Sequence, residues 1–339
     1  MIVAPSTQQT APAPTVAVIV PCFNAGRGLA ATLDALLDQT CKPEEIVVVD
    51  DGSTDGSAAL AEAYGGVVRV VRQTNSGAAS ARYRGVLESH SDLIVFNDAG
   101  DISRPRRVEL LRAALISNPG AVASYSVTWI KSRPEPSRVS LTGGAVDGTV
   151  TEVPDALSRI LAQSWPLAIG MNLAVRREVA IVSAEVPRFY RAANDYALQV
   201  RTAKLGSFVH VAAVTLEYEE TQGGISSQNG YVQQTGYALC AAAECLQSLP
   251  DRTGVDVAGF RKRVDEAWPG IALHMYLRGN YALMRKVMAL GLKFRRLHRS
   301  IRGLWWALDR AEHERALDSA ICLRTVVRLA NRFRPGFSR

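Results

Sequence analysis

The stretch Glu45-Ile-Val-Val-Val-Asp-Asp-Gly-Ser-Thr-Asp-Gly56 joins an apolar β-branched run directly to a turn rich in Asp and Gly. A run that is apolar on both faces is typical of a strand buried inside a parallel sheet. The turn places Asp50 and Asp51 at the carboxyl end of that strand, and its Ser and Thr are suited to cap a following helix. Ordinary βα turns share this composition, so the stretch alone predicts a strand, a turn and a helix.

The alternation of apolar strands and helices continues on both sides of this stretch. The expected strands are Val16–Val20, Glu45–Val49, Val67–Val71, Leu93–Phe96 and Ala121–Ile130. The expected helices between them are Arg27–Gln39, Thr54–Tyr64, Gly77–His90 and Pro105–Ser117. Such a pattern predicts an α/β, Rossmann-like fold with a mainly parallel central sheet. Ligand sites in these folds lie outside the carboxyl ends of the strands.

The alternation breaks in a Pro- and Gly-rich segment, Lys131–Thr149, where we expect a surface insertion. Two more strands and two more helices are expected after it, at Leu167–Val175, Phe208–Tyr218, Asp155–Gln163 and Asn194–Leu205. From Tyr231 onward only helical patterns remain, at 231–249, 257–290 and 304–332. The sequence therefore predicts a flexible tail over residues 1–14, a domain over 15–230 with halves 15–117 and 118–230, and an all-helical C-terminal region over 231–339.

Composition limits the class of protein. The chain has 339 residues, 47% hydrophobic and 21% charged, as expected for about two globular units. Its net charge of +7 suits an anionic partner without identifying it. The five cysteines contain no C-x-x-C pair, which argues against a disulfide framework or a zinc cage and favours a reducing compartment. No apolar run approaches the ~18 residues of a membrane span, and residues 1–14 do not resemble a signal peptide, so we expect a cytoplasmic protein.

A second pair of carboxylates follows the strand expected at Leu93–Phe96, where Asp98 and Asp101 should reach the same edge as Asp50 and Asp51. Acids at two strand ends are costly unless a cation or hydrogen-bond donors compensate them. Mg²⁺ or Mn²⁺ bridging to a diphosphate is the natural cation, because hard ions prefer oxygen ligands and an ion on phosphate needs few protein ligands.

The helix expected to open at Gly77 carries two arginines, Arg82 and Arg84, that can bring positive charge near a phosphate. Positions two apart on a helix point in different directions. At most one of the two arginines is therefore expected to face the site, and the other is expected to be solvated.

Four stretches in this order make the sequence resemble the family 2 glycosyltransferases, whose nucleotide-binding fold is called GT-A: Ile19–Asn24, Val47–Asp55, Asn75–Arg82 and Asp98–Asp101. The resemblance covers about the first 115 residues and continues more weakly through Asn194-Asp195 to Ser226. It implies a nucleotide-binding half at 15–117 and an acceptor half at 118–230. The implied reaction is an inverting transfer from a UDP, GDP or dTDP sugar to a hydroxyl of a glycan or lipid-linked acceptor, in cell-surface polysaccharide biosynthesis.

The resemblance also implies roles for single residues. The backbone from Pro21 to Phe23, together with Asp50 or Asp51, is expected near the base. Arg82 is expected close to the diphosphate or supporting the acids, and Asp98 at the ribose and the metal. The second acid of the family's D-x-D motif is Gly100 here, so metal ligation falls to Asp98, to Asp101, or largely to the diphosphate.

The chain departs from the family twice more. It has Arg82-Tyr83 where the family often has Arg-Asn, and Asn194-Asp195 where the family often has Glu-Asp. An inverting transfer needs a carboxylate to take the proton of the attacking hydroxyl, and the resemblance assigns this to Asp195. The alternative is a helix-capping Asp without chemistry.

The segment before Asp195 holds two expected acceptor contacts. Trp165 can stack on a sugar ring and Asn172 can hydrogen-bond hydroxyls, although a Trp in such a place is more often part of the core. His210 lies in an apolar strand and is interpreted as a core histidine.

Two other functions remain open at this point. A sugar-phosphate nucleotidyltransferase uses a similar sheet, but it requires a Lys in the loop after the first strand, and Pro21–Gly28 lacks the distal Lys. An inactive nucleotide-binding assembly subunit is suggested by Gly100 in the acidic motif. The fold alone does not identify the substrate.

The C-terminal stretch Arg285–Arg339 contains fourteen Lys and Arg against four acids, a local charge of +10. Arg324, Arg328 and Arg332 form one basic helical stripe beside apolar residues, which predicts attachment to the inner face of an anionic membrane. The alternative is that the apolar side packs on the catalytic domain or a second subunit. Nucleic acid is not expected as a partner, because no reading motif accompanies the charge.

Overall fold

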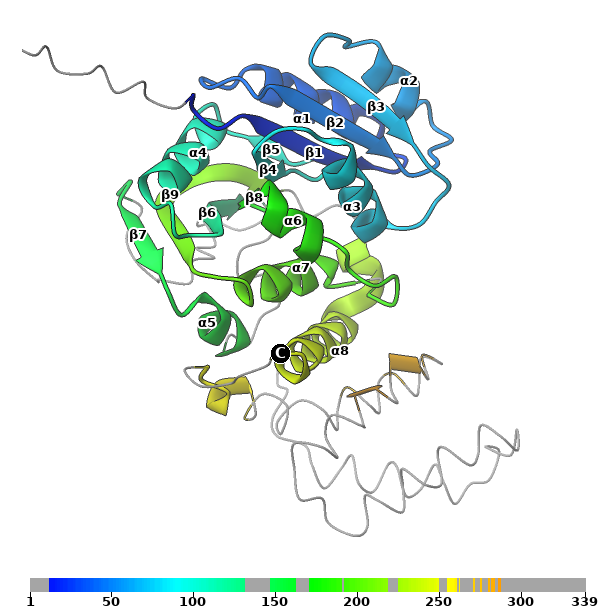
Figure 1. Ribbon diagram of the computed structural model, residues 1–339. Coiled ribbons are helices and arrows are strands. Elements are labelled where there is room, and N and C mark those ends of the chain that lie inside the picture. Colours follow the sequence, from blue (N-terminus) through cyan, green and yellow to red (C-terminus); the bar gives the residue numbers. More distant parts are fainter. Residues whose placement is uncertain are drawn as a thin grey trace, which may run out of the picture.

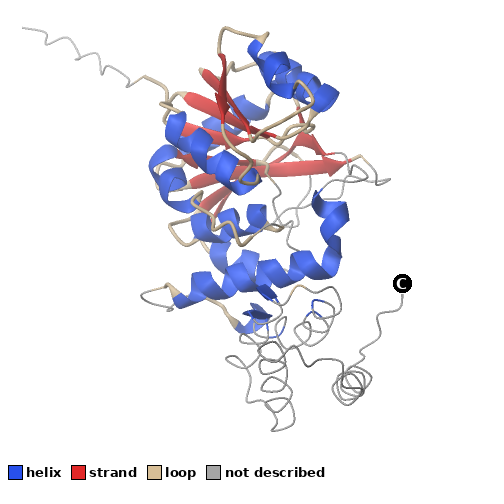
Figure 2. Ribbon diagram, turned by 90° about the vertical axis from the view of Figure 1, so that its right-hand side faces the viewer, coloured by secondary structure: helices blue, strands red, loops and turns tan. Residues whose placement is uncertain are grey.

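The computed structural model describes residues 12–131, 147–162, 171–190, 192–218, 225–249 and 255–260, and the single residues 262, 271, 275, 280, 282, 283, 286 and 287. Within these residues one nine-stranded sheet lies between helices, and a further helical layer packs below it (Figures 1 and 2). The strand order is β3-β2-β1-β4-β8-β6-β9-β5, with β7 also paired to β9.

The first half of the domain has the predicted alternation. Its strands are β1 (Val16–Cys22), β2 (Glu45–Asp50), β3 (Val68–Arg72) and β4 (Leu93–Phe96), and its helices are α1 (Gly26–Leu37), α2 (Ser57–Glu62) and α3 (Ala78–Glu88). The pairings β3-β2, β2-β1 and β1-β4 are all parallel. All residues of β1 and β4 are buried, as expected for strands with helices on both faces.

The second half is a mixed extension of this sheet. Its strands are β5 (Ile102–Ser103), β6 (Ala123–Ile130), β7 (Val150–Val153), β8 (Leu173–Arg176) and β9 (Phe208–Tyr218). Its helices are α4 (Arg107–Ser117), α5 (Ala156–Ala162), α6 (Arg177–Ser183), α7 (Asn194–Ala203) and α8 (Ile225–Gln247). Strand β8 runs antiparallel to β4 and β6, whereas β6 and β9 pair in parallel. The predicted α/β fold is confirmed, but the sheet is mixed and not mainly parallel: β3-β2-β1-β4 and β6-β9 pair in parallel, whereas β8, β5 and β7 join antiparallel.

The strands contribute side chains to two hydrophobic layers. On β1, Val18 packs in the same layer as Leu29 of α1, while the next residue, Ile19, packs in the opposite layer with Ala81 of α3. Helix α3 approaches β1 closely, because a Cβ added at Gly85 would lie 2.3 Å from Ile19 Cγ2. This close packing fixes the helix that carries Arg82.

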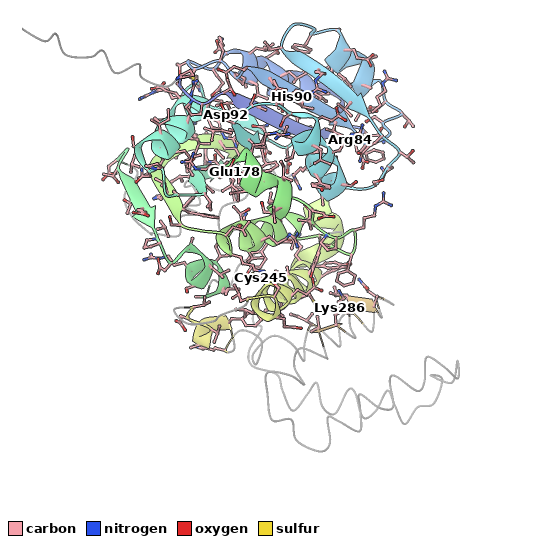
Figure 3. All side chains as sticks on the ribbon, in the orientation of Figure 1. Arg84, His90, Asp92, Glu178, Cys245 and Lys286 are labelled. Atoms are coloured by element: carbon pink, nitrogen blue, oxygen red, sulfur yellow. The ribbon has the colours of Figure 1, made fainter. Side chains whose placement is uncertain are left out.

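The layer that contains Ile19 continues into the helices at the end of the described chain. Helix α8 packs on α7, and buried Leu239 and Leu246 join the same core as Tyr196. The hydrophobic core therefore runs across residue 230. Lys286, labelled in Figure 3, lies close to α8 and forms an ion pair with Glu244 at 2.8 Å.

Several predictions fall on residues that the structure does not describe. They include most of the tail 1–14, most of the insertion after Lys131, and nearly all of the basic stretch Arg285–Arg339, of which only residues 286 and 287 are described. In the part of the chain that is described, no helix combines the length and the apolarity that a membrane crossing requires.

Candidate active site

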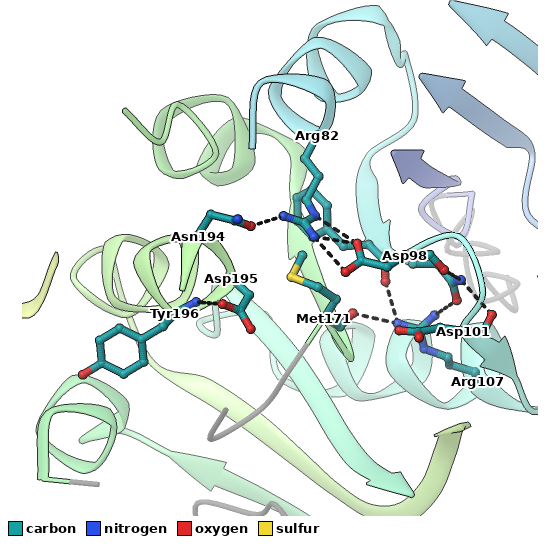
Figure 4. A network of polar contacts seen from close by, with 10 residues as sticks. Arg82, Asp98, Asp101, Arg107, Met171, Asn194, Asp195 and Tyr196 are labelled. Carbon is teal, nitrogen blue, oxygen red and sulfur yellow. Dashed lines mark hydrogen bonds and ion pairs between the residues drawn. The ribbon is translucent and has the colours of Figure 1, made fainter. Parts of the chain in front are cut away.

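Polar side chains gather where β2 and β4 end and where α3 and α7 begin. Figure 4 shows the central group, in which Arg82 lies between Asp98 on one side and Asn194 on the other. The carboxyl ends of parallel strands meet at one edge of a sheet, so the predicted acids of the β2 and β4 loops reach the same region.

Asp51 holds the loop that leads into α3. Its Oδ1 accepts hydrogen bonds from Gln73 Nε2 at 2.8 Å and from the Ser76 backbone N–H at 2.7 Å. Its Oδ2 accepts one from the Gly77 backbone N–H at 2.8 Å. Gly77 has a φ of +90°, which favours glycine there. Asp51 therefore fixes the backbone at the start of α3.

Hydrogen bonds connect the loop after β1 to the loop after β2. The backbone N–H groups of Ala25 and Gly26 donate to Ser57 Oγ, and that of Gly26 also donates to Asp55 Oδ2 at 3.0 Å. Asp50 is buried and accepts the Ser53 N–H at 3.2 Å. Pro21 is buried as well, whereas Phe23 is 52% exposed and presents an aromatic ring at the end of β1.

Arg82 makes a bidentate ion pair with Asp98. Its Nη2 lies 2.6 Å from Asp98 Oδ1 and 2.8 Å from Oδ2, and its Nε lies 3.2 Å from Oδ1. The Arg82 side chain is 6% exposed and that of Asp98 37%. Arg84, labelled in Figure 3, instead pairs with Glu88 one turn later on α3 and is half-exposed. One arginine of the two therefore faces the site, as predicted.

The start of α7 brings Asn194 and Asp195 to the other side of Arg82. Arg82 Nη1 donates to Asn194 Oδ1 at 2.5 Å, and both side chains are buried. Ala193 has a φ of +54°, an unusual backbone conformation for alanine that begins the helix. The strained residue thus stands directly before the two polar residues that the sequence singled out.

Asp195 is half-buried, and its Oδ1 accepts the backbone N–H of Tyr196 at 2.8 Å. The N-cap position of α7 belongs to Ala193, and no side chain caps it. Burial raises the pKa of Asp195, while the Tyr196 N–H and the charge of Arg82 partly offset that rise. A carboxylate whose pKa is raised is a stronger base than an ordinary Asp.

Asp101 lies in the same loop after β4 as Asp98, and its backbone N–H donates to the Asp98 carbonyl. It is 8% exposed, and its carboxylate makes no hydrogen bond or ion pair with any described residue. Burial, and next the neighbouring charge of Asp98, raise the pKa of Asp101 well above its usual range. Such a carboxylate is suited to a cation that would compensate its charge.

Arg107 is a buried cation that no sequence motif pointed to. It is 0% exposed and donates to five oxygens, those of Phe96 O, Asn97 Oδ1, Ser103 Oγ, Met171 O and Asn172 Oδ1. Burial lowers the pKa of Arg107 to about 10, which leaves it charged at neutral pH. The available sequence signal was that Arg107 precedes Leu111 and Leu115 at intervals of four residues, which places it on the apolar, buried face of α4.

Two expected acceptor contacts are not brought to the site. Asn172 is 0% exposed, and its amide is engaged by Arg107 Nε at 2.9 Å and by the Val127 carbonyl at 3.1 Å. The expectation that Asn172 faces an acceptor therefore does not hold in this structure. Trp165 lies outside the described residues. His210 is a core residue as predicted, buried against Tyr125, and burial lowers its pKa to about 4.

The acidic loop after β4 supplies the oxygen ligands that a divalent metal ion would need. Within the described ranges, no group of three or more His, Cys, Asp or Glu side chains is arranged to hold a metal ion. Asp98 and Asp101 supply carboxylate oxygens, which suit Mg²⁺ or Mn²⁺ if other ligands come from a diphosphate and water. The donor set thus fits an ion that arrives with its substrate.

Residues 17–181 match the family model described as glycosyl transferase family 2. The chain carries a family 2 glycosyl transferase domain. Glycosyltransferase YibD of Escherichia coli strain K12 is 34% identical over 115 residues, which are 33% of this chain and 33% of that protein. Validoxylamine A glucosyltransferase of Streptomyces hygroscopicus subsp. limoneus is 36% identical over 118 residues, 33% of this chain and 26% of that protein. The match thus spans about a third or less of these relatives' own length.

Solved structures extend the likeness of the fold to most of the chain. The crystal structure of S. aureus TarS 1-349 has a TM-score of 0.58 at 16% identity, covering 94% of this chain and 92% of that one. Its complex with UDP-GlcNAc has a TM-score of 0.59 at 15% identity. At this identity the likeness concerns the fold, and it confirms the predicted GT-A-like architecture for the family 2 domain.

Proposed function

We propose that the protein is an inverting glycosyltransferase that moves a sugar from a nucleotide diphosphate sugar to a hydroxyl group. The observation that carries the proposal is the arrangement around Arg82, which lies between Asp98 on the donor side and the start of α7 with Asp195. A displacement reaction with inversion needs groups on two opposite sides of one carbon atom. The family 2 domain supports the same reaction class.

The donor would lie against the ends of β1, β2 and β4. Exposed Phe23 and the adjoining Pro21 backbone would contact the base, with Asp50 and Asp51 beside it. Because Asp51 already accepts three hydrogen bonds, its part would be to hold the loop beneath the donor. The complexes of TarS with UDP and with UDP-GlcNAc support a uridine nucleotide as the first donor to test.

Mg²⁺ or Mn²⁺ would bind with the diphosphate at Asp98 and Asp101. The partly exposed carboxylate of Asp98 supports this position, as does that of Asp101, which pairs with no residue that the structure describes. Such an ion, when bound, neutralises charge on the leaving diphosphate. Arg82 would hold the Asp98 carboxylate in its orientation, and the charge of buried Arg107 would partly offset that of Asp101.

Asp195 would act as the base on the acceptor. Its carboxylate would take the proton of the acceptor hydroxyl while that oxygen attacks the anomeric carbon. The bond from that carbon to the diphosphate oxygen breaks as the new glycosidic bond forms, and the nucleoside diphosphate leaves with the electron pair. The raised pKa of Asp195 supports this assignment, because it brings the base nearer to working pH.

The acceptor would be a glycan or a lipid-linked sugar at the inner face of an anionic membrane, as part of cell-surface polysaccharide synthesis. The local charge of +10 over Arg285–Arg339 supports the membrane proposal, at about 1 kcal/mol per basic residue near the surface. Sedimentation with anionic liposomes at low salt tests it. Binding that is absent, or that persists after truncation before Arg285, would refute it.

The reaction class itself is tested by calorimetric titration of UDP, GDP, dTDP and CDP sugars with and without Mn²⁺, followed by donor hydrolysis without acceptor. Tight binding of one nucleotide sugar and slow release of its nucleoside diphosphate are expected. Release of pyrophosphate from a nucleoside triphosphate and a sugar phosphate would point to a nucleotidyltransferase instead. Nucleotide binding without any turnover would point to an inactive assembly subunit.

A further inference from the structure

Arg82 joins three segments that are far apart in the chain. It comes from α3, its Nε and Nη2 hold Asp98 after β4, and its Nη1 holds Asn194 at the start of α7 (Figure 4). The partners lie 16 and 112 positions away in sequence. Because the Arg82 side chain is only 6% exposed, little water competes for these bonds.

The contact with Asn194 is the one that reaches the acceptor side. Asn194 precedes Asp195 in the first turn of α7, and the helix is entered through Ala193 in a left-handed conformation. An alanine in that conformation costs about 1 kcal/mol or more, so the surrounding structure must hold the helix start in place. The hydrogen bond from Arg82 to the Asn194 amide oxygen is one such constraint, and it holds the residue directly before Asp195.

The neutral side chain of Asn194 limits the negative charge around Arg82 and Asp195. The guanidinium of Arg82 meets one carboxylate, that of Asp98, and one amide oxygen. A carboxylate at position 194, as in the Glu-Asp pair that the family often has, would compete with Asp98 for the same cation. It would also place a second negative charge beside Asp195. Asn194 supplies the acceptor oxygen without either effect.

We propose that Asn194 is a positioning residue: by accepting the Arg82 hydrogen bond, it fixes Asp195 relative to Asp98. The inference rests on the proposed function, in which Asp98 marks the donor and Asp195 the acceptor. In this role Asn194 acts through the position of Asp195 and not on either substrate. Misplacement of a reacting group by about 1 Å costs on the order of a hundredfold in rate, so loss of this bond should appear in turnover.

Three variants separate positioning from a merely structural contribution. Asn194→Leu keeps the branched shape of the side chain, although it is bulkier, and removes the acceptor oxygen, whereas Asn194→Asp keeps an acceptor oxygen. Thr202→Val is the matched control, because it removes the buried hydrogen bond from Thr202 Oγ1 to the Leu198 carbonyl within the same helix and does not touch Arg82. For each, kcat and the KM for the donor are measured, together with the melting temperature.

Asn194→Leu is expected to lower kcat tenfold to a hundredfold while the donor KM changes less than threefold. Asn194→Asp is expected to recover most of kcat, to within about fivefold of the wild type, because it keeps the hydrogen bond; the remaining loss reflects the negative charge that it adds beside Asp195. Thr202→Val is expected to lower only the melting temperature. A normal kcat in Asn194→Leu would overturn the inference, as would equal losses in the Leu and Asp variants. If Asn194→Leu does not fold, Asn194→Ser, whose side chain is too short to keep the contact, replaces it.

A crystal structure of the Asn194→Leu variant tests the geometry without any need for activity. The separation between the Asp98 and Asp195 carboxylates is expected to change from that of the wild type, and an unchanged separation would overturn the inference. This measurement also separates two failures. A wild type that transfers no sugar refutes the proposed function, whereas a wild type and a Leu variant that transfer equally well refute only the role of Asn194.

Discussion

Asp195→Asn is expected to abolish sugar transfer while leaving the donor site intact. The substitution changes one oxygen of a half-buried carboxylate to an amide nitrogen. The remaining oxygen can still accept the Tyr196 N–H, which Asp195 Oδ1 now accepts at 2.8 Å. The bond between Arg82 and Asn194 involves other atoms, so the start of α7 should keep its position.

The size of the loss follows from the role of a base. A positioned general base contributes about 10²- to 10⁴-fold to a rate, which corresponds to roughly 3 to 5 kcal/mol of transition-state stabilisation. We therefore expect kcat to fall by at least about a hundredfold. The dissociation constant of the nucleotide sugar should change by less than about threefold, because the base acts on the acceptor proton and not on donor binding.

Release of the nucleoside diphosphate in the presence of acceptor measures kcat, and calorimetric titration measures donor affinity. Asp92→Asn is a suitable control, since Asp92 also accepts backbone and side-chain bonds but does so at Thr15, outside the site. It should leave kcat unchanged. Near-normal turnover in Asp195→Asn would refute the assignment of the base, and a large loss of donor affinity would show that Asp195 serves donor binding.

The same substitution has a predicted effect on stability. Burial raises the pKa of Asp195 in the folded protein above its usual value of 3.8, so the folded state holds the proton more tightly than the unfolded chain. The ionised carboxylate consequently costs stability as the pH rises from that usual value through the raised one, and the full cost is present at neutral pH. Asp195→Asn should therefore raise the melting temperature at pH 7 and lose that advantage in acid. A lower melting temperature at pH 7 would contradict this.

Three further predictions concern the site and its support. Asp98→Ala should weaken nucleotide-sugar binding with or without Mn²⁺, and Asp101→Ala should weaken it mainly when Mn²⁺ is present. Titration of the nucleotide sugar with and without the metal checks both predictions. Unchanged metal dependence in Asp101→Ala would place the ion elsewhere. Gly85→Ala would put a Cβ 2.3 Å from a β1 methyl group, so it should lower the free energy of unfolding, measured by urea denaturation, by about 1–3 kcal/mol. Gly120→Ala is the control: its Cβ would meet nothing within 4 Å, and the free energy of unfolding should change by less than about 0.5 kcal/mol. Arg107→Leu removes the donor of five buried hydrogen bonds and should cost about 3–5 kcal/mol by the same measurement; a loss below about 1 kcal/mol would refute the view that this cation supports the acidic loop.

Much of the fold was predictable because its signals are local. Strands such as Val16–Cys22 are apolar at nearly every position, and the helices between them have clear periodicity, so β1 to β4 and their helices follow from the sequence. The elements that were missed give weak signals. Strand β5 has two residues, and three of the four residues of β7 are exposed. The direction of β8 depends on its neighbours and not on its own composition.

The site was predictable where a residue's place at a strand end, as for Asp98, or on the inner face of a helix, as for Arg82, determines what it can reach. It was not predictable where long-range packing decides. Asn172 was expected to face an acceptor, but it is buried because Arg107, from a helix 65 positions earlier, needs its amide oxygen. Asp51 was expected beside a base, and its carboxylate binds the backbone of a loop more than twenty positions later.

The topology of the sheet also bears on how the domain is made. Strands β1 to β4 are synthesised once the ribosome has passed Phe96, so four of the nine strands can pair while the rest of the chain is still being made. Strand β6 has to wait for β9, which ends at Tyr218, before it finds its parallel neighbour. The contact between Arg82 and Asn194 spans 112 positions and forms only after α7 has emerged. We therefore expect a nascent chain that ends before α7 to have a paired donor-side sheet while it lacks the acceptor side. Asp195 then takes its place across Arg82 from Asp98 only late in folding.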